Sequence, residues 1–197
     1  MSLIKPVSVL AIFFAGIISI VAPVKAEEST RISVSFHGRM FNSVASDYLE
    51  RPTFVSIEKR SGDEMVLVVR VTKLVRDQYG LDYTEIRFLK TKVDDYLVLI
   101  NKFNEWEALA TTRGDSFTKD IGKAEVWGSF GRPDVQFTFH SGNATHHFLA
   151  LKFCAMGTCL NDSGFVLSAD DAKNFATTLK QFQSGEIKQN EIDSVYK

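Results

Sequence analysis

The chain has 197 residues, of which 45% are hydrophobic and 24% are charged, and its formal net charge is −1. This composition is typical of a globular protein, and it excludes a disordered chain, a collagen-like chain and a protein with many membrane spans. Because there is no excess of basic residues, we do not expect nucleic-acid binding.

The first 26 residues have the pattern of a secretory signal peptide. Lys5 precedes an apolar run over 7–22, and Val24 and Ala26 place small residues at positions −3 and −1 of a cleavage site after Ala26. The run is shorter than the roughly 20 residues of a membrane-spanning helix, so cleavage is favoured over an uncleaved membrane anchor. The residue directly after the cleavage site is Glu27 and not a cysteine that could carry a lipid.

We therefore expect an exported protein, periplasmic in a Gram-negative host and otherwise secreted, with no stable membrane anchor after cleavage. The predicted organisation is a signal peptide over 1–26, one domain over 27–185 and a polar C-terminal tail over 186–197. In an oxidising compartment the two cysteines, Cys154 and Cys159, are expected to form a disulfide. Their spacing matches neither a redox Cys-x-x-Cys motif nor half of a four-cysteine zinc site.

One strand and a short helix are predicted first along the mature chain. Alternating apolar residues indicate a strand over Arg31–His37, and Phe41, Val44 and Tyr48 follow helical spacing in a segment that ends before Pro52.

A hairpin is predicted next, from Thr53–Lys59 and Glu64–Leu74 around a turn at 60–63. The expected register places Lys59 opposite Glu64, Ile57 opposite Val66 and Val55 opposite Val68. Both faces of the second strand are apolar, which is typical of a central strand.

The middle of the chain contains a strand, a helix and another strand. Asp82–Lys90 is predicted to be a strand, 95–111 a helix and Ala124–Phe130 a further strand. Because Val98 and Ile100 are β-branched, a strand at the start of 95–111 remains the alternative.

A second hairpin is predicted from Asp134–His140 and His146–Cys154. Its expected register pairs His140 with His146 and Phe137 with Leu149, which separates an apolar face from a polar one. A short strand over Phe165–Leu167 and a helix over 169–183 complete the domain. This helix is capped at its start by Ser168 and ends at Gly185. The predicted fold class is α+β: a single antiparallel sheet of about 7–8 strands with two main helices, about 95–111 and 169–183, packed on it.

His140 and His146 are weak candidates for a zinc or copper site, because the expected register places them side by side on the polar face. His147 points to the other face and a third ligand is not evident, so a solvated pair with a buried His147 is favoured. We predict no metal site, no cofactor and no catalytic residues.

Other short motifs have simpler explanations. Ser-x-x-Lys occurs at Ser56, Ser116 and Ser194 without the companion motifs of serine-acylating enzymes. Arg113–Ser116 spells an adhesion tetrapeptide but is also ordinary helix-end and turn sequence. Asn143–Thr145 forms a glycosylation sequon. Of the acidic residues near one turn (Asp162, Asp170 and Asp171), the last two are favourable charges in the first turn of a helix.

Three functions remain open from the sequence. The first is an exported non-catalytic binding protein that acts on a protein partner as an inhibitor, an immunity-type factor or an accessory factor. The second is a hydrolase or metal-dependent enzyme centred on His140 and His146. The third is a carrier of a small apolar ligand, for which Trp106, Trp127 and the many phenylalanines would line a pocket, although most of them sit at core positions. The first is favoured because no catalytic signature accompanies the predicted domain.

Overall fold

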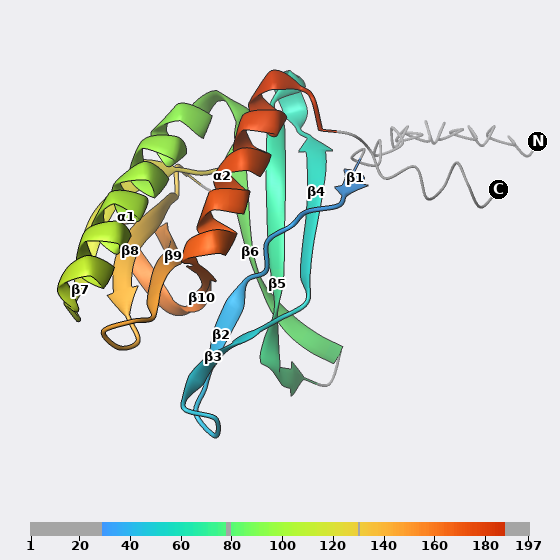
Figure 1. The fold of residues 1–197 in the computed structure, drawn as a ribbon. Helices are drawn as coiled ribbons and strands as arrows, with labels where there is room; N and C mark the ends of the chain where they lie inside the picture. Colours follow the sequence, from blue (N-terminus) through green and yellow to red (C-terminus); the bar gives the residue numbers. More distant parts are fainter. Residues whose placement is uncertain (1–28, 78–79, 130, 188–197) are drawn as a thin grey trace, which may run out of the picture.

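The computed structural model describes residues 29–77, 80–129 and 131–187, so the predicted signal peptide and nearly all of the predicted tail lie outside the described residues (Figure 1). The fold is α+β, with two helices and antiparallel strand pairing in two sheets. The strands are β1 (Ser29–Ile32), β2 (Arg39–Asn42), β3 (Asp47–Glu50), β4 (Thr53–Lys59), β5 (Met65–Asp77), β6 (Gly80–Leu89), β7 (Thr118–Glu125), β8 (Asp134–Ser141), β9 (His147–Ala155) and β10 (Thr158–Ser168), and the helices are α1 (Val93–Arg113) and α2 (Ala169–Ser184). Among the described residues, no helix is both long and apolar enough to span a membrane.

The strands form a four-stranded sheet of order β1-β4-β5-β6 and a six-stranded sheet of order β3-β2-β10-β9-β8-β7. The prediction of a single sheet is therefore wrong. In the four-stranded sheet, β4, β5 and β6 follow one another as antiparallel hairpins. Helix α1 then connects β6 to β7 of the six-stranded sheet. Strands β6 and β10 approach each other without pairing, so the backbone ladder is broken between the sheets.

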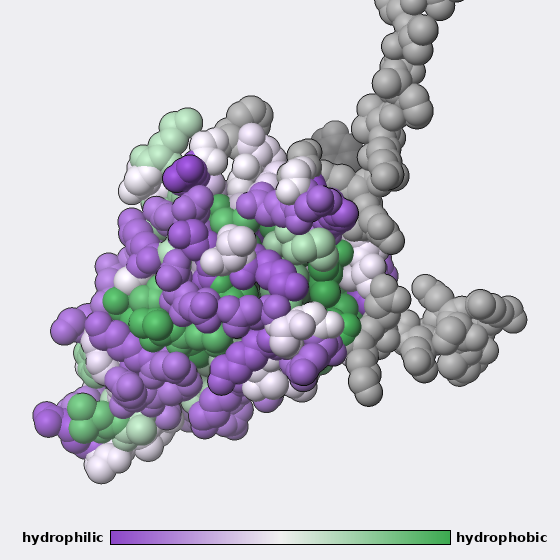
Figure 2. Space-filling model, turned by 90° about the horizontal axis from the view of Figure 1, so that it is seen from above, coloured by the Kyte–Doolittle hydropathy of each residue, from purple (hydrophilic) through white to green (hydrophobic). Residues whose placement is uncertain are grey.

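The core lies between the inner faces of both sheets and the two helices, which run side by side across the six-stranded sheet (Figure 1). Phe175 of α2 is fully buried, and its ring centroid lies 5.2 Å from that of Phe36 and 5.0 Å from that of Phe88 in β6. One side chain of α2 thus joins the six-stranded layer to the four-stranded sheet. Seen from above in Figure 2, the surface is mostly hydrophilic, with apolar patches between the polar side chains.

Both predicted helices are confirmed. Helix α1 begins at Val93, two residues before the predicted start, which excludes the alternative of a strand opening. Helix α2 begins as predicted, because the Ser168 side chain accepts a hydrogen bond from the Asp171 N–H. It ends where Gly185 adopts a left-handed conformation, with φ of 79°.

Both predicted hairpins exist, but both predicted registers are wrong. In the first, Lys59 pairs with Met65 rather than with Glu64, because Gly62 and Asp63 adopt positive φ and lengthen the loop by one residue. In the second, Phe137 pairs with Leu151 rather than with Leu149. That shift of two residues keeps every side chain on its predicted face. Strand β5 is central in its sheet, as predicted.

Three other local predictions are corrected. The first strand covers Ser29–Ile32 and not Arg31–His37. The segment predicted as helical from Phe41 to Tyr48 is the β2–β3 hairpin, in which the two rings are cross-strand partners. Strand β7 covers Thr118–Glu125 instead of 124–130, because the chain after Glu125 turns away into a loop that is closed by a Val126 N–H to Pro133 C=O bond.

Candidate binding groove

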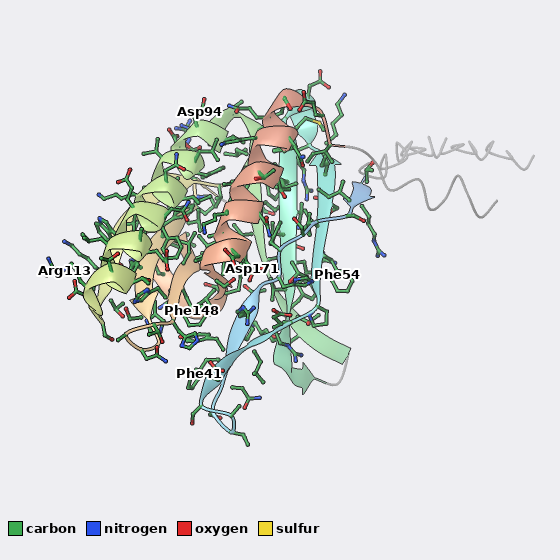
Figure 3. The ribbon with its side chains drawn as sticks, viewed as in Figure 1. Phe41, Phe54, Asp94, Arg113, Phe148 and Asp171 are labelled. Atoms are coloured by element: carbon green, nitrogen blue, oxygen red, sulfur yellow. A yellow bond between two sulfur atoms is a disulfide. The ribbon has the colours of Figure 1, made fainter. Side chains whose placement is uncertain are left out.

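The outer face of the four-stranded sheet, the face turned away from the core, combines charged and aromatic side chains. Along β6, Ile86 and Phe88 are buried inward, so the alternating Glu85 and Arg87 point outward. The same face extends across the neighbouring strands. Glu85 lies opposite Arg70 of β5, and Arg70 lies opposite Phe54 of β4. Phe54, which Figure 3 labels on β4, is 49% exposed.

Ion pairs connect the charged residues of this face. Glu85 is 10% exposed, and its carboxylate contacts Arg70 at 2.5 Å and also contacts Arg87. Glu58 contacts Arg60, and its carboxylate lies 3.8 Å from the Arg87 Nε. Each glutamate therefore serves two guanidinium groups, and Arg87 lies between the two glutamates.

Trp127 covers one end of the network. It comes from the loop after β7, and its backbone N–H donates to the Arg87 C=O at 2.9 Å. Its ring packs against the small buried cluster formed by Val66, Val68 and Leu89. The Arg60 guanidinium lies 4.3 Å from the ring centroid and that of Arg87 lies 5.4 Å from it, distances at which cation–π attraction operates.

Two hollows open beside these side chains, and Tyr83 lines both. One has a volume of about 470 Å³ and lies between β6, the Trp127 loop and the ends of β9 and β10; the other has a volume of about 300 Å³ and lies over β1, β4 and β5. We call the two hollows together the groove. Its charged side chains are Arg31, Lys73, Arg70, Arg87, Glu58 and Glu85.

The predicted histidine pair is not assembled. His140 lies opposite Phe148 instead of His146. Its two ring nitrogens lie 3.0 Å from the Tyr48 hydroxyl and 3.0 Å from the Thr118 hydroxyl. His146 instead lies in the exposed turn, with Nδ1 3.1 Å from the Asn143 side-chain oxygen.

Burial and the nearby Lys152 charge lower the pKa of His140 below its ordinary value of 6.5. Burial also raises the pKa of Tyr48. His147 is buried as predicted, and its Nε2 lies 3.2 Å from the Asp115 carbonyl oxygen. Within the described part of the chain, no group of three or more His, Cys, Asp or Glu side chains converges as metal ligands would.

The remaining motifs have structural partners. Arg113 and Asp115 of the adhesion tetrapeptide pair with each other at 2.7 Å (Figure 3 labels Arg113). Ser56 lies within a strand, not at a helix start, and Lys59 pairs with Asp63 at 2.6 Å. Asn143 lies in an exposed turn.

Asp171 is buried and accepts hydrogen bonds from the His37 N–H at 3.0 Å and from the Ser168 hydroxyl at 2.5 Å. Asp170 is exposed at the start of α2 and lies near Lys173, while the Asp162 side chain and the Ser194 motif lie outside what the structure describes. Trp106 and most of the phenylalanines pack in or against the core.

The predicted disulfide joins Cys154 of β9 to Cys159 of β10, two residues that are cross-strand partners. Met156 and Gly157 adopt positive φ in the turn between them. The bridge therefore fixes a hairpin end, and Phe153, Ala155 and Ser163 near this end line one wall of the groove.

The sequence analysis missed the groove. Its residues come from six strands and a loop, so no local motif marks it. A signal was nevertheless present in 83–88, where polar Tyr83, Glu85 and Arg87 alternate with Thr84, Ile86 and Phe88. That pattern predicts a strand with one polar face, and the arginine and tyrosine on this face are residue types enriched at interfaces.

Comparisons with protein-family models, with curated proteins and with solved structures find no significant match to this chain. The function is therefore argued from the geometry of the groove.

Proposed function

We propose that the protein is an exported, non-catalytic binding protein that acts on a protein partner as an inhibitor, an immunity-type factor or an accessory factor, and that the groove is its binding surface. The observation that carries this proposal is the set of aromatic and arginine side chains gathered there. Trp127, Tyr83 and Arg87 belong to the three residue types that dominate the energetics of protein interfaces.

The arrangement also favours recognition on energetic grounds. Ion pairs and stacking already hold the arginines in place, so ordering them on binding costs little side-chain entropy. Tyr83 is 45% exposed and Phe54 is 49% exposed, so both have apolar surface left to bury. A rigid polar frame with exposed aromatic rings is what a docking surface requires.

Site-specific photo-crosslinking tests this proposal. Tyr83 is replaced by benzoylphenylalanine in the full chain, expressed and exported in its own host, and adducts are identified by mass spectrometry. The matched control places the same probe at Leu109, which is 56% exposed on α1.

We expect one protein adduct from position 83, reduced by excess unlabelled chain, and none of that protein from position 109. Equal adducts from both positions, or no competed adduct from position 83, would contradict the proposal.

A further inference from the structure

We propose that the β2–β3 hairpin is a cover that opens in acid and uncovers an apolar strip on the outer face of the six-stranded sheet, with His140 as the proton sensor. The hairpin runs from Arg39 to Glu50. No described residue that lines the groove belongs to it, so the inference does not rest on the proposed function.

The apolar strip consists of Phe148 and Ala150 of β9 and Val166 of β10. Leu149 lies in the core between the sheets, so the alternate residues of β9 face outward (Figure 3 labels Phe148). The three side chains are nevertheless only 6%, 9% and 7% exposed. The Tyr48 ring of β3 packs on them, with its centroid 4.8 Å from that of Phe148. Tyr48 therefore shields this strip from water.

The hairpin is attached to the six-stranded sheet at two places, its base and Tyr48. At the base, β2 pairs with β10 at one described residue pair, Arg39 with Val166, and ion pairs fix the Arg39 side chain. Beyond the base, Phe41 is 53% exposed and Val44 is 95% exposed, and the turn of the hairpin projects from the body of the molecule (Figure 1). Release of Tyr48 would therefore free the outer half of the hairpin.

Tyr48 covers His140 as well as the strip. Its hydroxyl lies 3.0 Å from the His140 Nε2, and the two ring centroids lie 5.5 Å apart in an edge-on arrangement. The hydroxyls of Tyr48 and Thr118 can each turn to accept a hydrogen bond, so protonation of the imidazole does not by itself break these contacts. What the covered imidazole lacks is water to solvate its charged form.

The charged groups around His140 act in opposite directions. On the outer face, the charged side chains nearest to it in register are Asp120 of β7, which is bonded to a threonine hydroxyl, and Lys152 of β9. On the hairpin, Arg39 and Glu50 share the face of Tyr48 and pair with each other. Asp120 favours the imidazolium, but burial and Lys152 prevail and lower the pKa of His140 below its ordinary 6.5.

Opening and protonation are therefore coupled. Lifting Tyr48 returns water to His140 and raises its pKa towards 6.5, so the open form binds the proton more tightly than the closed form. By linkage, protons must then favour the open form. The open population is expected to grow as the pH falls from 6.5 through the lowered pKa of His140.

Thiol accessibility beneath Tyr48 tests the proposal in the full chain. Ala150→Cys places a thiol in the covered strip, and Leu109→Cys, at a site that is 56% exposed on α1, is the control. Each is reacted at pH 7.5 and pH 5.0 with dithiodipyridine, which also modifies thiols in acid. The ratio of the two rates removes the intrinsic pH dependence of the reaction. Circular dichroism confirms the native fold at both pH values.

We expect this ratio to rise about five-fold between pH 7.5 and pH 5.0. With His140→Gln, which stays neutral, the ratio should be the same at both pH values. With Tyr48→Ala, which removes the ring, it should be high at both. An unchanged ratio in the parent, the same rise with His140→Gln, or a rise that appears only with loss of the native spectrum would overturn the proposal.

Reciprocity supplies a second measurement that needs no introduced thiol. If acid opens the hairpin by charging His140, removal of the Tyr48 ring must raise the pKa of His140. Proton NMR titration of the imidazole in Tyr48→Ala should therefore give a pKa closer to 6.5 than in the parent chain. The same pKa in both proteins would also overturn the proposal, and a competed photo-adduct at position 83 would still leave the proposed function standing.

Discussion

On the outer face of the four-stranded sheet, Glu58 and Glu85 each contact two arginines, whereas on the outer face of the six-stranded sheet His140 is held between the hydroxyls of Tyr48 and Thr118. The first face pairs opposite charges. The second lowers the pKa of His140, because burial and Lys152 both disfavour the imidazolium. The two faces therefore differ in what they offer a partner: paired charges on one, and an imidazole with a lowered pKa on the other.

The largest expected effect on stability comes from removing the Phe175 ring, through which the two sheets are in contact. Phe175→Ala removes the ring that packs against both Phe36 and Phe88, and it should lower the free energy of unfolding by about 3–5 kcal/mol. Denaturant unfolding measures it. Leu109→Ala, at a site that is 56% exposed, is the control and should stay within about 0.5 kcal/mol. A similar value for Phe175→Ala would mean that α2 does not join the sheets.

Removing one carboxylate tests the paired charges of the four-stranded sheet. Glu85→Gln should lower the free energy of unfolding by about 2 kcal/mol, because it takes a charge-assisted partner away from both Arg70 and Arg87. Glu50→Gln is the matched control, since Glu50 pairs with Arg39 but is 56% exposed, and it should cost about 0.5 kcal/mol or less. Equal effects in equilibrium unfolding would show that the network adds nothing beyond ordinary surface pairs.

The disulfide stiffens only the six-stranded sheet, at the turn between β9 and β10. Replacing Cys154 and Cys159 together by Ser should leave the fold intact and lower the free energy of unfolding by about 2 kcal/mol, because the closed loop is short. Circular dichroism checks the fold, and denaturant unfolding checks the cost. Loss of the native spectrum would contradict this expectation.

Protonation of His140 should have the smallest effect on the free energy of unfolding. Because its pKa is lowered in the folded state, the unfolded state binds more protons below pH 6.5, and stability should decline as the pH falls from 6.5 through the lowered value. Lys152→Gln should raise the pKa of His140 towards 6.5 and weaken this decline. Proton NMR titration of the imidazole follows the pKa. An unchanged pKa in the variant would remove Lys152 as a cause.

The sequence predicts correctly those features whose signals lie within the same short segment of the chain. Helix α2 was predicted because Ser168, the apolar stripe through Phe175 and Gly185 are all local signals. The register of the first hairpin was not, because it depends on positive φ at Gly62 and at Asp63, a non-glycine position that sequence does not mark. Strand β7 was misplaced because Thr118–Asp120 is an exposed, polar edge.

The candidate site was harder to predict than the fold, for a related reason. Periodicity places Glu85 and Arg87 on one face of a strand, but it does not say which strand lies beside them. The Trp127 ring reaches Arg60 and Arg87 only because the loop after β7 returns across the boundary between the sheets. Contacts between sheets are set by tertiary packing and leave no periodic pattern in the chain.

The position of Trp127 also gives the molecule a built-in optical reporter. The chain has two tryptophans, and they lie in different settings. Trp127 lies near two guanidinium groups in the groove, and Trp106 lies against the core near Phe117 and Phe139, with the ammonium groups of Lys102 and Lys119 each 5.2 Å from its ring. Indole emission responds to nearby charge and to water, so a ligand in the groove perturbs the fluorescence of Trp127, whereas loss of the core perturbs that of Trp106. With Trp106→Phe or Trp127→Phe, occupancy and unfolding become separately visible in the unlabelled protein.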